Sequence, residues 1–226
     1  MTQRYKKILI IKPSSLGDIV LSLPALCALR RSFPQAEISW LIRPEFTEVL
    51  DGHSCLDEII VFDRRFLGKA WWNVRAFGAI ISLIGKLRKG NFDLVLDFQG
   101  LFRTAALGWL SGCRKRVGMK MSREFAHIFY TDRIEQTKEC IHLVDYYLKM
   151  AGSVGCEELS VEFGLPVKAE ALESVNKLLN SHGVDSNNYA VFIPSSAHID
   201  KCWPIERVAE LADRIAEEFG LSIIAT

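Results

Sequence analysis

The sequence lacks several patterns that would assign it to well-known classes of protein. Its six cysteines are scattered without a C-x-x-C pair, and no two histidines stand at the spacing of zinc ligands. Such cysteines are typical of reduced thiols in a cytosolic protein rather than of a disulfide framework. The first strand-to-helix turn has neither the G-x-G-x-x-G pattern of dinucleotide-binding folds nor the G-K-S/T of a phosphate-binding loop. We therefore expect no zinc site, no disulfide scaffold and no nicotinamide cofactor.

Long apolar runs and a charge imbalance are missing as well. No stretch approaches the roughly 18 apolar residues of a membrane span, and the start MTQRYKKILIIK is too short for a signal-peptide core. The formal net charge is +1, which does not indicate a nucleic-acid partner. Apolar residues make up 49% of the 226, enough for a sizeable core. We expect a folded, cytoplasmic protein that can still lie against a membrane.

The sequence is organised around residues 7–31, KILIIKPSSLGDIVLSLPALCALRR. Ile8–Ile11 has the length and β-branching of a buried parallel strand, and a turn of small residues and a stretch with helical spacing follow it. Because parallel sheets bind ligands at the carboxyl ends of their strands, this turn is the first candidate site. Gly17 permits a positive φ or a close approach of backbone. Asp18 is either a helix N-cap or a general base held at the cleft.

Further strands alternate with helical stretches along the chain. We expect strands at residues 37–42, 56–62, 92–98, 189–193 and 221–225. This alternation predicts a parallel, doubly wound α/β sheet. A turn-like segment at 181–188 precedes a second strand–turn–helix unit, which stops after its next strand. We therefore expect a Rossmann-like N-terminal domain over residues 1–165 and the incomplete beginning of a second one over 166–226.

Two segments of the sequence are basic and free of carboxylates. Residues 64–92 contain seven Lys and Arg, the pair Trp71-Trp72 and apolar residues at helical spacing. Either they form a core-facing helix with a solvated basic face, or their surface rests on an anionic bilayer. Residues 113–123 contain five Lys and Arg. They form either a solvated loop or a loop that binds phosphates or carboxylates of a ligand.

Three stretches, taken in order, resemble one known family. The opening KPSSLGD followed by LPAL, the strand and turn DLVLDFQG, and the late turn PSS…DKCWP resemble the ADP-heptose:lipopolysaccharide heptosyltransferases, glycosyltransferase family nine. The resemblance implies the GT-B architecture, with two Rossmann-like domains that bind the acceptor and the nucleotide sugar. It also implies an inverting transfer of heptose to the inner core of lipopolysaccharide, at the cytoplasmic face of the inner membrane.

The resemblance assigns roles to individual residues. Asp18 takes the place of the general base, which deprotonates the acceptor hydroxyl. Ser196 and Lys201, with the amides of their turn, would hold the diphosphate of the donor. Without the resemblance, we would interpret Lys201 as an exposed cation. The residues implied on the acceptor side are Ser15, Gly17, Lys120 and Arg123, of which Arg123 would contact an acidic sugar.

The resemblance also implies partners: an ADP-heptose donor, an anionic lipid-linked acceptor (Kdo-lipid A or a heptosylated core) and the inner-membrane surface. It implies no metal, no other cofactor and no nucleic acid. Because the second domain is incomplete, we expect little or no turnover from this chain alone. Two alternatives stay open: a GT-B transferase for another nucleotide sugar, and a non-catalytic module that binds lipid or a partner. We assign no role to the cysteines or to His142 and His198; His142 is expected to be structural.

Overall fold

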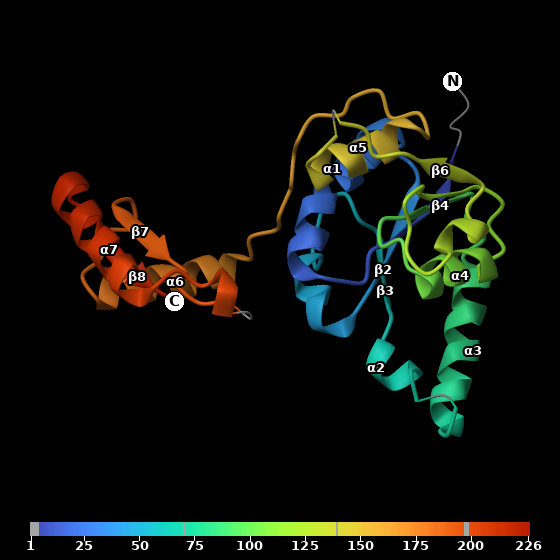
Figure 1. The fold of residues 1–226 in the computed structure, drawn as a ribbon, viewed down its shortest axis with the longest axis horizontal. Helices are drawn as coiled ribbons and strands as arrows, with labels where there is room; N and C mark the ends of the chain where they lie inside the picture. Colours follow the sequence, from blue (N-terminus) through green and yellow to red (C-terminus); the bar gives the residue numbers. More distant parts are fainter. Residues whose placement is uncertain (1–4, 70, 139, 197–198) are drawn as a thin grey trace. The chain divides into compact units, whose positions relative to one another are not determined.

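The computed structural model describes residues 5–69, 71–138, 140–196 and 199–226 (Figure 1). The chain divides into two units, Met1–Pro166 and Val167–Thr226, one residue after the expected boundary. Each unit has its own parallel sheet. No helix in the described part of the chain is both long and apolar enough to cross a membrane. The six cysteines, all in the described part of the chain, form no disulfide bond.

The first unit is built on a six-stranded parallel sheet in the order β3-β2-β1-β4-β5-β6. The strand bounds are β1 Lys7–Ile11, β2 Glu37–Ile42, β3 Glu58–Val61, β4 Leu94–Asp97, β5 Arg116–Met119 and β6 Asp132–Ile134. Ile8 on β1 pairs with Ile38 on one side and with Leu94 on the other. The strand order therefore reverses at β1 and β4, and such a switch point is where α/β sheets open a crevice for ligands.

Helices cover both faces of this sheet. They are α1 Leu16–Ser32, α2 Arg64–Leu67, α3 Val74–Lys89, α4 Phe102–Leu110 and α5 Leu143–Gly152, with 3₁₀ turns η1 Pro44–Val49 and η2 Ala126–Phe129. Ile8 and Ile10 pack in the core formed with α1 and α5, whereas Leu9 and Ile11 pack in the core formed with α3 and α4. Strand β1 is thus buried on both faces, and each such side chain contributes roughly 1.5–3 kcal/mol of hydrophobic stabilisation.

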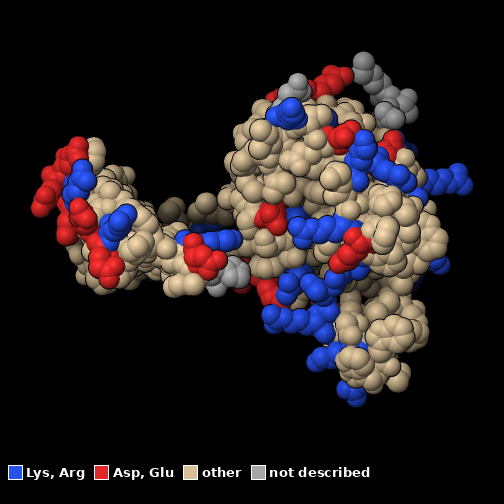
Figure 2. All heavy atoms as spheres, viewed as in Figure 1, with Lys and Arg blue, Asp and Glu red and all other residues tan. Residues whose placement is uncertain are grey.

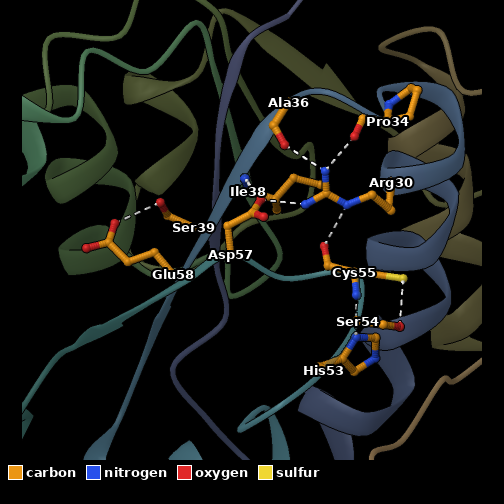
Figure 3. Close-up of polar contacts among 10 residues, drawn as sticks. All are labelled: Arg30, Pro34, Ala36, Ile38, Ser39, His53, Ser54, Cys55, Asp57 and Glu58. Carbon is orange, nitrogen blue, oxygen red and sulfur yellow. Dashed lines mark hydrogen bonds and ion pairs between the residues drawn. The ribbon is translucent and has the colours of Figure 1, made fainter.

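A polar network closes the amino edge of the sheet (Figure 3). The Arg30 guanidinium, on α1, donates to the Ala36 carbonyl at 2.7 Å and pairs with the Asp57 carboxylate. Asp57 in turn accepts from the Ile38 amide at 2.7 Å, at the start of β2. These bonds tie α1 to the segments that precede β2 and β3. The amino edge is therefore occupied by structural contacts, and the carboxyl edge is left for chemistry.

The second unit begins another α/β layer. Its elements are α6 Ala169–Ser181, β7 Tyr189–Phe192, the 3₁₀ turn η3 Ile199–Lys201, α7 Ile205–Phe219 and β8 Ser222–Ala225. The two strands pair in parallel, with Tyr189 opposite Ser222. Gly220 ends α7 with a φ of 65°, a conformation that glycine adopts without steric cost. The structure confirms the predicted α/β architecture, with a six-stranded and a two-stranded parallel sheet in the described part of the chain.

Two features of the fold differ from the sequence-based predictions. Residues 113–123 are not simply a loop, because Arg116–Met119 forms β5 and pairs with β4. The sequence ECIHLVDYYLKM also predicts a helix over residues 139–150. In the structure this helix, α5, begins at Leu143, and Glu139 lies outside the described residues. His142 is the N-cap of that helix, and its Nδ1 accepts from the Val144 amide at 3.3 Å. This is a structural role, as predicted for His142.

Candidate active site

A pocket of about 290 Å³ opens at the carboxyl ends of β1, β4 and β5. The turn after β1, the turn after β4, the segment after β5 and helix α5 all contribute to its wall. The polar side chains on that wall are Lys12, Asp18, Gln99, Ser122, Arg123 and Tyr147. The pocket lies where the strand order reverses, which is the expected position for a ligand in this class of sheet.

Asp18 is held in place by the residue that precedes its helix. It is the third residue of α1, and Ser15 is the N-cap. The Asp18 Oδ2 atom accepts from the Ser15 amide at 3.3 Å and from the Ser15 hydroxyl at 3.0 Å. Asp18 is therefore not the N-cap, which was one of its two predicted roles. Its carboxylate instead makes the reciprocal hydrogen bond of a capping box, to the amide of the N-cap residue. Its side chain is 36% exposed, so it is fixed and still accessible from the pocket.

Lys12 is a site residue that the sequence analysis missed. Its side chain is only 4% exposed, and its Nζ atom lies 3.6 Å from the Asp18 Oδ2 atom. The ammonium group also lies 5.8 Å from the ring centroid of Tyr147. Burial lowers the pKa of Lys12, while the carboxylates of Asp18 and Asp97 oppose that shift. A buried cation is costly unless it is paired, so Lys12 both depends on Asp18 and restrains it.

Asp97 lies beneath the pocket and holds the turn that follows β4 in place through hydrogen bonds. It ends β4 and is buried. Its Oδ1 atom accepts from the amides of Gln99 at 2.8 Å and Gly100 at 3.2 Å, and its Oδ2 atom accepts from the Tyr130 hydroxyl at 2.8 Å. Burial raises the pKa of Asp97, and these hydrogen bonds act against the rise. Gly100 has a φ of +68°, which this tight turn requires. The turn that lines the pocket is therefore rigid.

The predicted acceptor-side residues fall into two groups. Arg123 lines the pocket together with Asp18, and its amide donates to the Gly100 carbonyl at 2.9 Å. Beside it, the Ser122 hydroxyl oxygen is buried without a hydrogen-bond partner in the described structure. Such an atom is available to a ligand, since buried polar groups otherwise find partners. Lys120, by contrast, does not line this pocket: its ammonium pairs with Glu135 at 2.8 Å.

Ser15, the N-cap of α1, and Gly17, in its first turn, are exposed beside Asp18. Gly17 lies inside α1, and its φ is not positive. Of the two possibilities that the sequence allows for Gly17, the positive φ is therefore not the one found. A Cβ atom built on Gly17 would meet no heavy atom within 4 Å. Packing inside the described chain therefore does not require glycine here, and the close approach of a ligand stays a prediction.

The two predicted donor-side residues lie in the second unit, on the turn that follows β7. Ser196 and Lys201 are both exposed, and Lys201 is the last residue of η3. The Ser196 amide donates to the Cys202 sulfur at 3.2 Å, which brings the two ends of this turn together. His198 lies outside the described residues. Pro204 is the N-cap of α7.

The chain resembles known proteins in sequence over nearly all of its length. Residues 80–225 match the model of glycosyltransferase family 9 (heptosyltransferase). The chain is 26% identical over 214 residues to lipopolysaccharide heptosyltransferase 1 of Escherichia coli strain K12, covering 93% of this chain and 65% of that protein. It is 23% identical over 225 residues to the lipopolysaccharide core heptosyltransferase OpsX of Haemophilus influenzae, covering 99% and 60%. The chain thus spans less than two thirds of the length of these relatives.

Solved structures agree with this assignment. A family 9 glycosyl transferase from Veillonella parvula has a TM-score of 0.81 at 25% identity, over 100% of this chain and 64% of that one. The E. coli heptosyltransferase WaaC with ADP-2-deoxy-2-fluoro heptose has a TM-score of 0.73 at 26% identity, over 97% and 68%. The family model covers more than half of the chain, and the three motifs quoted above lie in the expected order. The chain belongs to glycosyltransferase family 9.

Proposed function

We propose that this chain is part of an inverting heptosyltransferase, which transfers heptose from ADP-heptose to the inner core of lipopolysaccharide. The observation that carries the proposal is the position of Asp18: in a family 9 chain, its carboxylate lines a pocket at the sheet's switch point together with Arg123. The names of the relatives supply the sugar and the acceptor class. The activity is proposed for a protein that includes the portion of the relatives beyond this chain.

In the proposed reaction, Asp18 acts as the general base. It takes the proton of an acceptor hydroxyl while that oxygen attacks the anomeric carbon of the donor. The bond from that carbon to the diphosphate breaks on the opposite side, so the configuration inverts and ADP leaves. Ser15 and Lys12 hold the Asp18 Oδ2 atom. No hydrogen bond or ion pair to its Oδ1 atom is found in the described part of the chain, which leaves that oxygen free to accept a proton.

The acceptor in this proposal is an anionic, lipid-linked sugar, either Kdo-lipid A or a heptosylated core. Arg123 supports it, because a guanidinium can bind a sugar carboxylate through two parallel hydrogen bonds. The unpartnered Ser122 hydroxyl supplies a further polar contact on the same wall. Ser15 and Gly17 would border the acceptor at the exposed turn. Lys120 takes part only if it exchanges its partner Glu135 for the acceptor.

The donor diphosphate is proposed to bind at the turn after β7. Lys201 supplies positive charge there, and Ser196 supplies a hydroxyl and a neighbouring amide. A diphosphate leaves as an anion, so the step needs a cation rather than an acid, and this proposal includes no metal or other cofactor. Because the acceptor is anchored in lipid, we place the protein at the cytoplasmic face of the inner membrane as a peripheral protein.

The decisive experiment compares this chain with a form extended to its full natural C-terminus. Both are assayed for transfer of heptose from ADP-heptose to Kdo-lipid A. In the active form, Asp18→Asn should lower turnover by about 10²- to 10⁴-fold, the usual contribution of a general base, while ADP-heptose binding persists. Asp145→Asn is the matched control, because Asp145 is an exposed carboxylate in the first turn of α5 and does not line the pocket.

Three results would contradict the proposal. Full activity in Asp18→Asn would reduce Asp18 to a capping residue. No heptose transfer by the extended form, combined with transfer of another nucleotide sugar, would leave the pocket and the base intact and make the sugar wrong. No transfer from any nucleotide sugar would favour the non-catalytic alternative.

A further inference from the structure

The segment between β3 and β4 contains the two most exposed tryptophans of the described chain. Trp71 and Trp72, between α2 and α3, are 93% and 77% exposed. Buried tryptophans contribute some of the largest hydrophobic stabilisation of any side chain, and Trp40 in the same unit is fully buried. Two adjacent indoles left in water therefore point to a surface that something else covers.

Helix α3 extends this apolar surface beyond what its own core contacts need. Ala76, Leu83 and Leu87 are buried, and Leu83 and Leu87 pack in the core formed with β1 and α4. A second set, spaced by three and four residues, points away from the core: Val74, Phe77 and Ile81, which are 86%, 54% and 56% exposed. Residues at this spacing share one face of a helix. The apolar arc of α3 is therefore wider than the part that the core covers, and the surplus lies next to the two tryptophans in sequence.

The charges around this surface are mostly positive, and the one carboxylate paired with a cation of α2 in the described structure is Glu45, 3.9 Å from Arg65. Between Asp63 and Asp93 the sequence has seven Lys and Arg and no carboxylate. Arg64, Lys69 and Arg75 form no ion pair in the part of the chain that the structure describes. In Figure 2 the surface formed by α2 and α3, at the bottom of the view, shows Lys and Arg atoms around uncharged atoms, with no Asp or Glu atoms at its tip.

A groove of about 240 Å³ runs between α2, α3 and α4 next to this surface. Its wall is mostly apolar and includes Leu67, Ile80 and Leu107. Two cations, Arg64 and Arg103, line it as well. Such a groove is complementary to a phospholipid. Its apolar wall matches the acyl chain, and its cations match the anionic headgroup.

We propose that α2, Trp71-Trp72 and the amino-terminal half of α3 form a membrane-docking surface for an anionic lipid bilayer. This docking surface consists of Arg64, Arg65, Lys69, Trp71, Trp72, Val74, Arg75, Phe77 and Ile81. Tryptophan is enriched where bilayer and water meet, and each Lys or Arg near an anionic leaflet adds attraction. Single-stranded nucleic acid also binds basic, aromatic surfaces, but it would leave the aliphatic stripe of α3 uncovered.

The docking surface is separate from the candidate active site, since none of its residues lines the pocket that contains Asp18. Attachment to a membrane can therefore be measured without sugar transfer. If the docking proposal is wrong, the proposed reaction is unaffected. If the proposed reaction is wrong, the docking proposal is equally unaffected.

The test uses the 226-residue chain and sedimentation with sucrose-loaded vesicles of phosphatidylcholine alone or with phosphatidylglycerol. The chain should bind the anionic vesicles, and Trp71→Ser/Trp72→Ser should weaken that binding about tenfold or more. Arg65→Gln/Lys69→Gln should weaken it by a similar factor at low salt, since each removed cation loses its attraction to the anionic leaflet. Lys138→Gln/Lys177→Gln is the matched control: it removes the same charge from exposed positions elsewhere and should bind like the parent chain.

A second measurement guards against a variant that weakens binding by misfolding. Trp109→Phe/Trp203→Phe leaves Trp71, Trp72 and the buried Trp40 as the fluorescent residues. Its emission should shift to shorter wavelength on anionic vesicles and be quenched by brominated lipid. Unchanged emission, equal binding of the docking-surface variants and the parent, or binding of a single-stranded oligonucleotide but not of vesicles would overturn the proposal.

Discussion

The two basic, carboxylate-free segments of this sequence have different surroundings in the structure. In residues 113–123 most of the charge is used inside the protein: Lys115 pairs with Asp132 at 2.7 Å, Lys120 pairs with Glu135, and Arg116 donates to the Phe129 carbonyl at 2.6 Å. In residues 64–92 only Arg65 and Lys86 form ion pairs within the described structure, with Glu45 and Glu58. The other five cations have none there, and the exposed Trp71 and Trp72 lie between two of them, Lys69 and Arg75. A run of positive charge therefore does not by itself predict a ligand, because its meaning depends on carboxylates that are distant in the sequence.

The largest expected difference between the two segments concerns their packing. A Cβ atom added to Gly118 on β5 would lie 2.3 Å from the ring of Tyr130, whereas one added to Gly78 on α3 would meet nothing within 4 Å. We predict that Gly118→Ala lowers the free energy of unfolding by about 2–3 kcal/mol through overpacking. Gly78→Ala should raise it by about 0.5–1 kcal/mol, because alanine favours a helix over glycine.

Chemical denaturation of both variants measures these changes. In the active extended form, Gly118→Ala should also lower turnover, since Tyr130 holds Asp97 beneath the pocket floor. If Gly118→Ala and Gly78→Ala had the same free energy of unfolding, β5 and α3 would be equally tightly packed at these glycines. The proposed difference in packing between the two segments would then be wrong.

The elements that the sequence predicted well are those whose signals are local. Strand β1, with its run of β-branched residues, lies where it was expected, and a helix follows its turn as predicted. That helix already begins at Leu16, before Asp18, which was one of the expected N-caps. Strand β5 was missed, because Arg116–Met119 mixes charge and glycine with few apolar residues. Its conformation depends on pairing with β4, where Val117 lies opposite Leu96. That contact joins residues far apart in the chain, and no local pattern reports it.

The same limit applies to the site. Asp18 and Arg123 were assigned to one site through the family resemblance, and the structure brings them to one pocket. Lys12 was missed, although it directly follows an apolar strand at the edge where ligands bind. Its burial depends on Asp18 and on Tyr147 of α5, so a lysine that looks exposed in the sequence becomes part of the pocket only after folding.

A smaller effect should separate paired from unpaired lysines. Lys115→Gln should cost about 0.5–1 kcal/mol of stability, since its ion pair with Asp132 is only partly exposed. Lys69→Gln should stay within about 0.5 kcal/mol of the parent chain. A double-mutant cycle with Asp132→Asn tests this: coupling to Lys115 that weakens at high salt is expected. A measurable coupling free energy between Asp132 and Lys69 would contradict the distinction between paired and unpaired lysines.

The smallest expected effect depends on pH and on the exposed pair of Lys120 with Glu135. The hydrogen bond from Lys120 and its positive charge lower the pKa of Glu135 in the folded protein. A carboxyl group with a lowered folded pKa stabilises the fold above its unfolded pKa of about 4.3, and that contribution is lost as the pH falls through the folded value. Lys120→Gln should therefore be slightly less stable than the parent at pH 7, and the two should converge in acid. Arg75→Gln, whose cation has no ion pair in the described structure, should show no such convergence. The measurement is a set of unfolding curves from pH 2 to 7. If both variants showed the same dependence on acid, Arg75 would have a carboxylate partner. The exposed face of α3 would then have balanced charge, which would not favour an anionic membrane surface.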